Sequence, residues 1–367
     1  MSLTLSVDGD RWRAHLRAVA DRTPGLVPVA KGNGYGFGLG RLARRTQWLA
    51  DGAPRDPDRP GPPQCGDVLA VGTYHEVAEV VQRYHGDVLV LTPWRPFGAA
   101  LQIDPAVDPG LSGRVVHTIS RPGDLAALLE RQPDARYVLE LVTSMLRHGM
   151  TPRELRGLEG LTARGRLEGV ALHLPLAQGS HLSQVERLLT DVVAAGLPTH
   201  TLWVSHLTAD ELERLRSAYA DFTIRPRIGT DLWLGDRGAL RVTATVLDVH
   251  AVERGDVFGY RSRTAPKSGH LLVVSGGTAH GIGLEAPTGD QSLKSRAASL
   301  ARGGMDAVGF VRSPYSIDGK QRLFAEPPHM QASMLFLPAG ARVPEVGDEI
   351  DVRVRYTATT FDRVVIS

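Results

Sequence analysis

One lysine in this chain has a sequence setting that suits covalent chemistry. Lys31 directly follows a short apolar run and opens the segment Lys-Gly-Asn-Gly-Tyr-Gly; the only other lysines are Lys267, Lys294 and Lys320. A partly desolvated lysine has a lowered pKa, and its neutral amine can form a Schiff base with an aldehyde. Glycines beside it allow a ligand to approach the backbone closely. Taken alone, a lysine among glycines is more often a loop cation or an anion clamp.

Other polar residues lie at the ends of later apolar runs or just after them. They are Glu140, Arg147, His173, Ser205, Arg227, Gly229 and Thr230. Each alone also fits a packed residue or a surface ion pair. If the runs are strands of one barrel, these residues lie together, because the loops after the strands form a single face.

The elements that would position these residues alternate between two kinds. Apolar runs of strand length alternate with stretches of helical periodicity, such as 74–84 and 184–195. Eight runs occur in sequence, at 26–30, 67–71, 87–91, 115–119, 137–141, 169–173, 202–205 and 224–228. This order predicts an α/β fold, a (β/α)8 TIM-type barrel, over residues 1–236.

A different pattern follows the barrel. Strand-like stretches at 240–252, 270–274 and 350–356 are separated by turn residues. We therefore expect a mostly β C-terminal domain over residues 237–367. The segment 52–64, rich in proline, aspartate and glycine, is predicted to be a surface loop.

Composition excludes several classes of protein. The net charge is only +2 in 367 residues and no apolar run reaches the length of a membrane span, so neither nucleic acid nor a membrane is an expected partner. The single cysteine, Cys65, excludes an internal disulfide and a thiolate-rich metal site, and no metal is expected. The first residues resemble no secretory signal, which makes the cytoplasm the expected compartment.

Several segments together resemble the alanine racemase family, the fold-type III enzymes that use pyridoxal 5'-phosphate (PLP). Residues 30–38, Ala-Lys-Gly-Asn-Gly-Tyr-Gly-Phe-Gly, resemble the family's cofactor-lysine signature. Further similar segments follow in the family's order, at 143–150, 169–173, Ser205, 225–235, 329–334 and 346–350. Because the matches extend over both predicted domains, the chain resembles a divergent member of this family.

The resemblance implies a role for each matching residue. Lys31 would carry PLP as a Schiff base and act as the base on one face of the substrate α-carbon. The other expected cofactor contacts are Tyr35, Ser205, Gly229 and Thr230 at the phosphate, His173 against the ring and Arg227 at the pyridine nitrogen. Arg147 would contact the phenolate oxygen and the substrate carboxylate, with Met330 also at the substrate. The family further implies a homodimer in which each C-terminal domain contributes to the partner's active site.

Two departures from the family pattern affect the expected chemistry. Glu140 stands where the family often has a carbamylated lysine, and we expect its carboxylate to brace Arg147. Thr278 stands where the family has the tyrosine that acts as the second catalytic acid/base. An alcohol is a far weaker acid than a phenol with a pKa near ~10. A replacement would be His280, with His329 or Tyr260 behind it; otherwise Lys31 works alone with water.

The sequence therefore favours a PLP-dependent racemase of amino acids, with alanine as the default substrate by resemblance. An alternative is a catalytically altered relative that binds PLP or a small amino acid without racemising it, because of Thr278. Decarboxylation and metal-assisted elimination are disfavoured by the single cysteine and by the absence of a Cys-Asp-Gly segment. At the C-terminus, Tyr356 is a candidate for a further phosphate contact.

Overall fold

The computed structural model describes residues 2–52, 64–176, 179–284 and 311–367. The chain forms two compact units, which we describe separately. The barrel unit comprises Arg13–Gly34 and Gly38–Gly235, and the β unit comprises Met1–Trp12, Tyr35–Phe37 and Asp236–Ser367.

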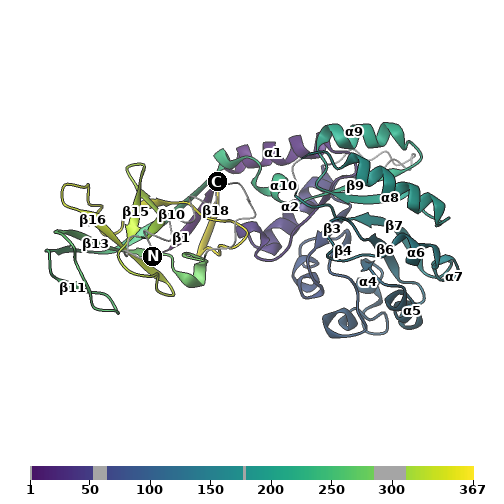
Figure 1. Ribbon diagram of the computed structural model, residues 1–367, viewed down its shortest axis with the longest axis horizontal. Coiled ribbons are helices and arrows are strands. Elements are labelled where there is room, and N and C mark those ends of the chain that lie inside the picture. Colours follow the sequence, from purple (N-terminus) through teal and green to yellow (C-terminus); the bar gives the residue numbers. More distant parts are fainter. Residues whose placement is uncertain (1, 53–63, 177–178, 285–310) are drawn as a thin grey trace. The chain divides into compact units, whose positions relative to one another are not determined.

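The barrel unit contains eight parallel strands that close on themselves (Figure 1). They are β2 (Val27–Pro28), β3 (Val68–Val71), β4 (Asp87–Val90), β5 (Val115–Ile119), β6 (Arg136–Leu141), β7 (Arg166–Leu172), β8 (Thr201–Ser205) and β9 (Thr223–Ile228). Strand β2 pairs with β9, and a parallel bridge between Val29 and Ala70 joins it to the β3 side. The Ala30 N–H donates to the Ala70 carbonyl at 2.8 Å across this closure. The predicted barrel is therefore confirmed, with all eight strands near their predicted positions.

Helices connect the strands on the outside of the barrel (Figure 1). They are α1 (Gly9–Arg22, which begins in the β unit), α2 (Leu39–Asp51), α3 (Val77–Val80), α4 (Pro109–Ser112), α5 (Pro122–Arg131), α6 (Pro152–Arg156), α7 (Glu159–Thr162), α8 (Leu182–Ala194), α9 (Ala209–Ala218) and α10 (Thr230–Leu234). The helix predicted at 184–195 is confirmed by α8. The helix predicted at 74–84 is wrong in length, because a 3-10 turn (η2, Tyr74–Glu76) leads into the single turn of α3. Valines at 77, 80 and 81 are weak helix formers and favour such an early end.

Period-two alternation determines which residues line the barrel interior. The buried core cluster contains Val27, Val29, Val68, Ala70, Leu89, Val116, Val138, Ala171 and Trp203. Successive side chains of a strand point to opposite faces, so the positions two residues after core positions face inward again. Toward the C-terminal ends of the strands this next layer consists of Lys31, Gly72, Leu91, Thr118, Glu140, His173 and Ser205. Arg227 continues it on β9, two residues after the buried Arg225. The fold itself thus places most of the predicted site residues in one layer.

The β unit is built on a sheet of eight strands. They are β1 (Leu3–Val7), β10 (Leu240–Val252), β13 (Gly269–Ser275), β14 (Arg312–Ile317), β15 (Lys320–Phe324), β16 (Ala332–Pro338), β17 (Glu349–Val352) and β18 (Arg363–Ile366). Strand β13 pairs with both β16 and β10, which closes a ring of six strands. A separate hairpin pairs β11 (Val257–Phe258) with β12 (Arg263–Thr264). The predicted mostly β C-terminal region is confirmed.

The start of the chain belongs to the β unit. Strand β1 pairs antiparallel with β10 and parallel with β18, so residues 1–12 group with this unit. The predicted barrel range of residues 1–236 includes these residues. The long C-terminal segment of the β unit begins at Asp236, one residue before the predicted start of the C-terminal domain at residue 237.

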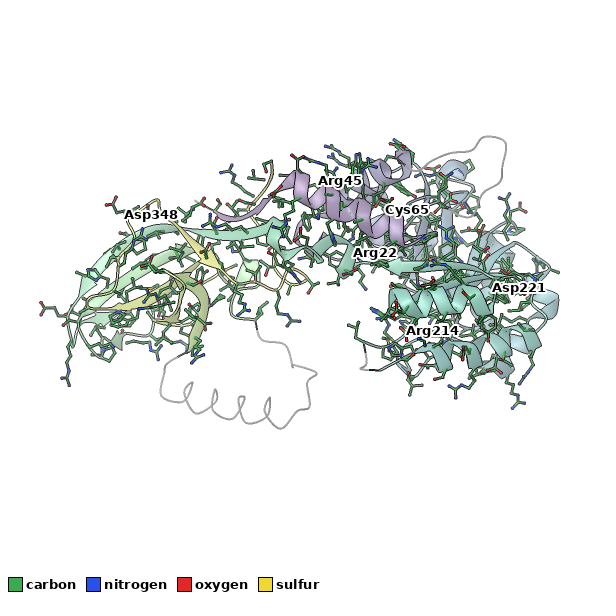
Figure 2. The ribbon with its side chains drawn as sticks, turned by 90° about the horizontal axis from the view of Figure 1, so that it is seen from above. Arg22, Arg45, Cys65, Arg214, Asp221 and Asp348 are labelled. Atoms are coloured by element: carbon green, nitrogen blue, oxygen red, sulfur yellow. The ribbon has the colours of Figure 1, made fainter. Side chains whose placement is uncertain are left out.

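Two further sequence expectations concern the surface and the thiol. Most of the predicted loop at 52–64 lies outside the described residues. Burial, with the nearby Asp67 and Asp21, raises the pKa of Cys65 (labelled in Figure 2) to about 12, which makes the thiol unreactive.

Among the helices of the described residues, none has the length and apolar character needed to cross a membrane.

A buried histidine makes the barrel unit sensitive to acid. The His117 ring is fully buried, and its Nδ1 lies 2.8 Å from the hydroxyl of Tyr74. Burial lowers its pKa from the usual 6.5 to about 4. Between these values the unfolded chain binds a proton that the folded chain excludes, so stability falls as pH falls.

We expect His117→Gln to reduce this acid sensitivity. In that pH window the wild type should lose up to about 1.4 kcal/mol per pH unit more than the variant. Urea unfolding at a series of pH values measures the difference. Equal pH slopes for the two proteins would contradict a neutral buried His117.

Candidate functional site

Lys31 lies where the first barrel strand ends, beside the loop that follows β3. The Glu76 carboxylate joins the two segments, accepting from the Gly32 N–H at 2.8 Å and from the Gly72 N–H at 2.6 Å. A Cβ atom at Gly72 would lie 3.0 Å from the Cβ of Lys31. A glycine at position 72 therefore leaves the space that the base of the lysine side chain needs.

The surroundings of Lys31 favour a neutral amine. Burial, followed by the positive charges of Arg147 and Arg227, lowers its pKa from 10.5, and Glu76 opposes this only in part. Two guanidinium groups near one ammonium make the charged form costly. Lys31 is consequently more nucleophilic than an ordinary surface lysine.

His173 and Ser205 occupy adjacent strands of the same layer. The His173 Nδ1 lies 2.9 Å from the Ser205 hydroxyl, and the Thr143 hydroxyl donates to the His173 carbonyl at 2.7 Å. Burial, then Arg227 and Arg147, lowers the pKa of His173 to about 3. The ring is therefore neutral at physiological pH and can lie against a flat ligand without adding charge.

Arg227 and Glu140 are charged groups buried inside the barrel. They are 6% and 4% exposed, and the Arg227 Nη2 donates to the Leu172 carbonyl at 2.9 Å. Burial lowers the pKa of Arg227 to about 10, while Glu140 raises it. Burial likewise raises the pKa of Glu140 against the attraction of Arg227 and Arg147. Within the described residues, the Arg227 Nε and Glu140 Oε2 atoms have no hydrogen-bond partner.

Four other predicted contact residues lie in the loops and turns around these strands. Arg147 is exposed in the loop after β6 and forms no ion pair with Glu140 in the described part of the chain, so the expected bracing is only a longer-range attraction. Gly229 directly precedes α10 and Thr230 begins it. Backbone N–H groups in such a first turn are open to an anion. Tyr35 is 5% exposed, adopts a φ of 54°, and groups with the β unit.

The remaining candidates all lie in the β unit. Thr278 is exposed and its N–H donates to the His329 carbonyl at 2.8 Å. The His280 ring is buried, accepting from the Gly277 N–H through Nδ1 at 3.2 Å and contacting Asp362 through Nε2 at 3.1 Å. Both ring nitrogens of His280 therefore have partners within the described residues. Met330 is 73% exposed.

Comparison with solved structures identifies the architecture. The chain is similar over its whole length to alanine racemase from Bartonella henselae with covalently bound pyridoxal phosphate, with a TM-score of 0.71, 16% identity and 100% of both chains covered. It is also similar to alanine racemases from E. faecalis (TM-score 0.67, 19% identity, 100% of this chain and 98% of that one) and from the D-cycloserine producer Streptomyces lavendulae (0.67, 18%, 100% and 97%).

The chain has the alanine racemase fold. No family model matches it, and no curated protein sequence does. The likeness found by these comparisons therefore lies in the architecture.

Within the alanine racemase fold, the structure adds site residues that the sequence interpretation did not identify. Glu76 accepts from the N–H of Gly32, which follows Lys31, and from the N–H of Gly72, and its signal in the sequence is the Thr73-x-x-Glu76 capping box. His206 adopts a φ of 62°, and its ring centroid lies 5.4 Å from that of His173. No sequence pattern indicates this second histidine, because its position depends on the backbone conformation after β8.

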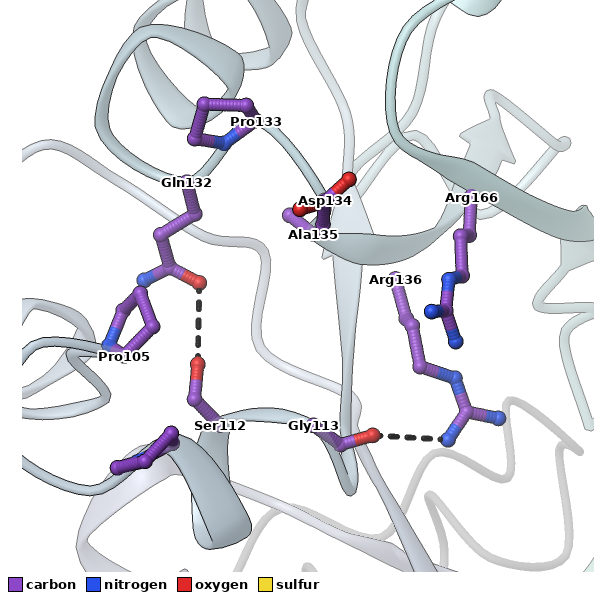
Figure 3. A pocket seen from close by; sticks show the side chains of 10 residues that line it. Pro105, Ser112, Gly113, Gln132, Pro133, Asp134, Ala135, Arg136 and Arg166 are labelled. Atoms are coloured by element: carbon purple, nitrogen blue, oxygen red, sulfur yellow. Dashed lines mark hydrogen bonds between the residues drawn. The ribbon is translucent and has the colours of Figure 1, made fainter.

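A separate pocket of about 200 Å³ lies at the opposite end of the barrel (Figure 3). Arg136 and Arg166, which begin β6 and β7, line it. Arg136 is already paired with Asp87 at 2.6 Å and Glu168 at 2.8 Å. Since the N-terminal face of such barrels usually serves stability, we do not assign the active site there.

Proposed function

We propose that this protein is a PLP-dependent racemase of small amino acids, with Lys31 as the cofactor lysine. The observation that carries the proposal is the layer containing Lys31, Glu140, His173, Ser205 and Arg227 inside a barrel of the alanine racemase fold. An amine with a lowered pKa, a neutral ring and a buried guanidinium suit an aldehyde cofactor that is aromatic and anionic.

The residues present fit PLP. The Arg227 Nε is a buried N–H donor without a partner in the described residues, and a pyridine nitrogen is an acceptor. A permanently cationic donor keeps such a nitrogen unprotonated. Ser205, Tyr35 and the N–H groups at Gly229 and Thr230 would hold the phosphate, with the His173 ring against the pyridine. When bound, PLP supplies an acceptor for the electron pair of the substrate Cα–H bond.

The protein's own side chains would then bind the substrate and move protons. Arg147, whose guanidinium is exposed and without an ion pair in the described chain, suits the substrate carboxylate. Lys31 would remove or return the proton on one face of Cα. We further propose a homodimer in which the β unit, through Thr278 and Met330, completes the partner's site; alanine is the proposed default substrate.

Cofactor binding and racemisation can be tested in two steps. Protein incubated with PLP should acquire a visible absorption band that borohydride abolishes, leaving a reduced pyridoxal group on the peptide containing Lys31. Incubation with L- and D-alanine in D2O should then give deuteration at Cα together with inversion. Absence of the Lys31 adduct from PLP-saturated protein would refute the proposal.

A second candidate is a protein that holds PLP or an amino acid without racemising it. Thr278 favours this second function, because an exposed threonine hydroxyl is a far weaker acid than the phenol of a tyrosine and cannot take its place in proton transfer. Formation of the Lys31 adduct without any Cα deuteration, across a panel of amino acids, would select it.

The space beside Lys31 gives a further prediction. Gly72→Ala should reduce the fraction of protein that carries reduced pyridoxal on Lys31, because the new Cβ would crowd the Lys31 Cβ and the Glu76 carboxylate, each at 3.0 Å. Gly123→Ala, where a Cβ meets nothing within 4 Å, is the matched control. Mass spectrometry of the borohydride-treated peptides measures the fraction, and equal labelling of both variants would contradict the crowding.

A further inference from the structure

A histidine and a buried carboxylate form a pair in the β unit. The His329 Nε2 lies 2.7 Å from the Glu326 Oε1, and Glu326 is 1% exposed. A carboxylate oxygen accepts, so Nε2 carries the hydrogen. The only hydrogen bond of the His329 ring within the described residues is this one, so its other nitrogen, Nδ1, has no partner there. The pair thus presents an orientated imidazole with one nitrogen free to accept a proton.

Neighbouring groups of the β unit hold the Glu326 carboxylate and its backbone in place. The Tyr260 N–H donates to the Glu326 Oε2 at 3.1 Å, and the Arg263 guanidinium donates to the neighbouring Ala325 carbonyl at 2.9 Å. Gly259 has a φ of 72°, and a Cβ there would overlap the Glu326 carboxylate, so a side chain at this position would displace the carboxylate. A buried carboxylate is costly unless it is paired, and here both oxygens have donors.

The imidazole lines an open cavity of about 650 Å³. Other lining residues are Tyr260, Arg261, Thr278, Met330 and Gln331. Thr278 is joined to the histidine directly, since its N–H donates to the His329 carbonyl. His329 therefore lies in the same cavity as the threonine that replaces the expected acid/base, whereas His280 has both ring nitrogens engaged.

We propose that His329, orientated by Glu326, is the second acid/base of the reaction and takes the role that Thr278 cannot perform. This inference rests on the proposed racemase function and on a β unit that faces the partner's Lys31. His329 is the catalytic residue, and Glu326 is a positioning residue.

The proton balance needs no further reactant. In one direction the His329 Nδ1 accepts the proton as the Cα–H bond breaks, and the electron pair stays with the substrate and its bound cofactor. The Lys31 ammonium then gives a proton to the opposite face of Cα. The reverse direction exchanges the two roles. One proton leaves carbon and one returns, so nothing is oxidised or reduced.

The test compares three variants of the PLP-loaded full chain. His329→Gln should lower inversion of alanine at least ~100-fold, the scale of a lost general acid/base. It should keep the Lys31 adduct and deuterate only the enantiomer whose proton faces Lys31. His250→Gln is the matched control, since His250 forms an exposed pair with Asp248 at 3.3 Å in the same unit; its inversion rate should stay at the wild-type value.

The Glu326→Gln variant tests whether Glu326 orientates the His329 ring or only supports the fold. Nitrogen-15 NMR should show the Nε2-protonated tautomer of His329 in the wild type and a mixture of tautomers in Glu326→Gln, with a smaller loss of inversion. Mixed dimers of Lys31→Ala and His329→Gln subunits should regain inversion, because one of their two sites has both residues.

The outcomes separate the two proposals. If the wild type forms no Lys31 adduct and exchanges no Cα proton, the proposed function fails. If the wild type inverts alanine and His329→Gln inverts it equally fast, only the role of His329 is overturned. One-sided exchange in the wild type, or no recovery in mixed dimers, overturns it as well.

Discussion

Replacing Lys31 by alanine is expected to abolish pyridoxal attachment and to lower Cα–H exchange of alanine by about 10³-fold or more. The reason is that Lys31 would supply both the nucleophilic amine and one of the two proton carriers. Its pKa is lowered by burial and by Arg147 and Arg227, so its amine gives up a proton more readily than that of an ordinary lysine. Absorption spectroscopy and deuterium exchange measure the two effects independently.

The control for this substitution is Lys267→Ala. Lys267 is exposed in the β unit, and its removal should leave both the adduct and the exchange rate unchanged. Added methylamine should restore part of the exchange in Lys31→Ala, because a free amine can take over proton transfer at an emptied position. A reduced pyridoxal group on another lysine of Lys31→Ala would show that the cofactor lysine is misassigned.

The barrel could be predicted because its signals are local. Each strand is a short apolar run, and alternation along the run puts Lys31, Glu140, His173 and Arg227 on the inner face once the eight strands close. Neither the apolar runs nor their alternation depends on contacts between residues far apart in the sequence. The resemblance of short segments to alanine racemases then gave these same positions chemical roles.

The parts that the sequence did not predict depend on distant contacts. Strand β1 joins the β unit because it pairs with β10, more than two hundred residues away in the chain. His280 is the nearest histidine to Thr278 in sequence, but its ring is held by Asp362 near the C-terminus. The Glu326–His329 pair is local in sequence, yet its burial depends on the hairpin at Gly259 and Tyr260.

The buried charges of the barrel give the second prediction. Arg227→Met should destabilise the protein by about 1–3 kcal/mol, because the Leu172 carbonyl loses its charged donor and the buried Glu140 loses a positive charge that favours its ionised form. Glu140 would then remain buried, and its Oε2 already lacks a partner in the described chain. The same substitution removes the proposed donor to the pyridine nitrogen, so PLP retention should fall too. Urea unfolding followed by the fluorescence of the buried tryptophans measures the stability.

The double variant Arg227→Met, Glu140→Gln distinguishes charge from packing. If the loss of stability comes from an uncompensated carboxylate, neutralising Glu140 should recover much of it, because burial already opposes ionisation of that carboxyl. If the loss comes from a cavity, the double variant should be no more stable than Arg227→Met. PLP retention should stay low in both, since neither restores an N–H donor at position 227. The double variant would then recover stability without recovering PLP retention. This result is expected if Arg227 serves to bind the cofactor and Glu140 offsets part of the cost of burying its charge.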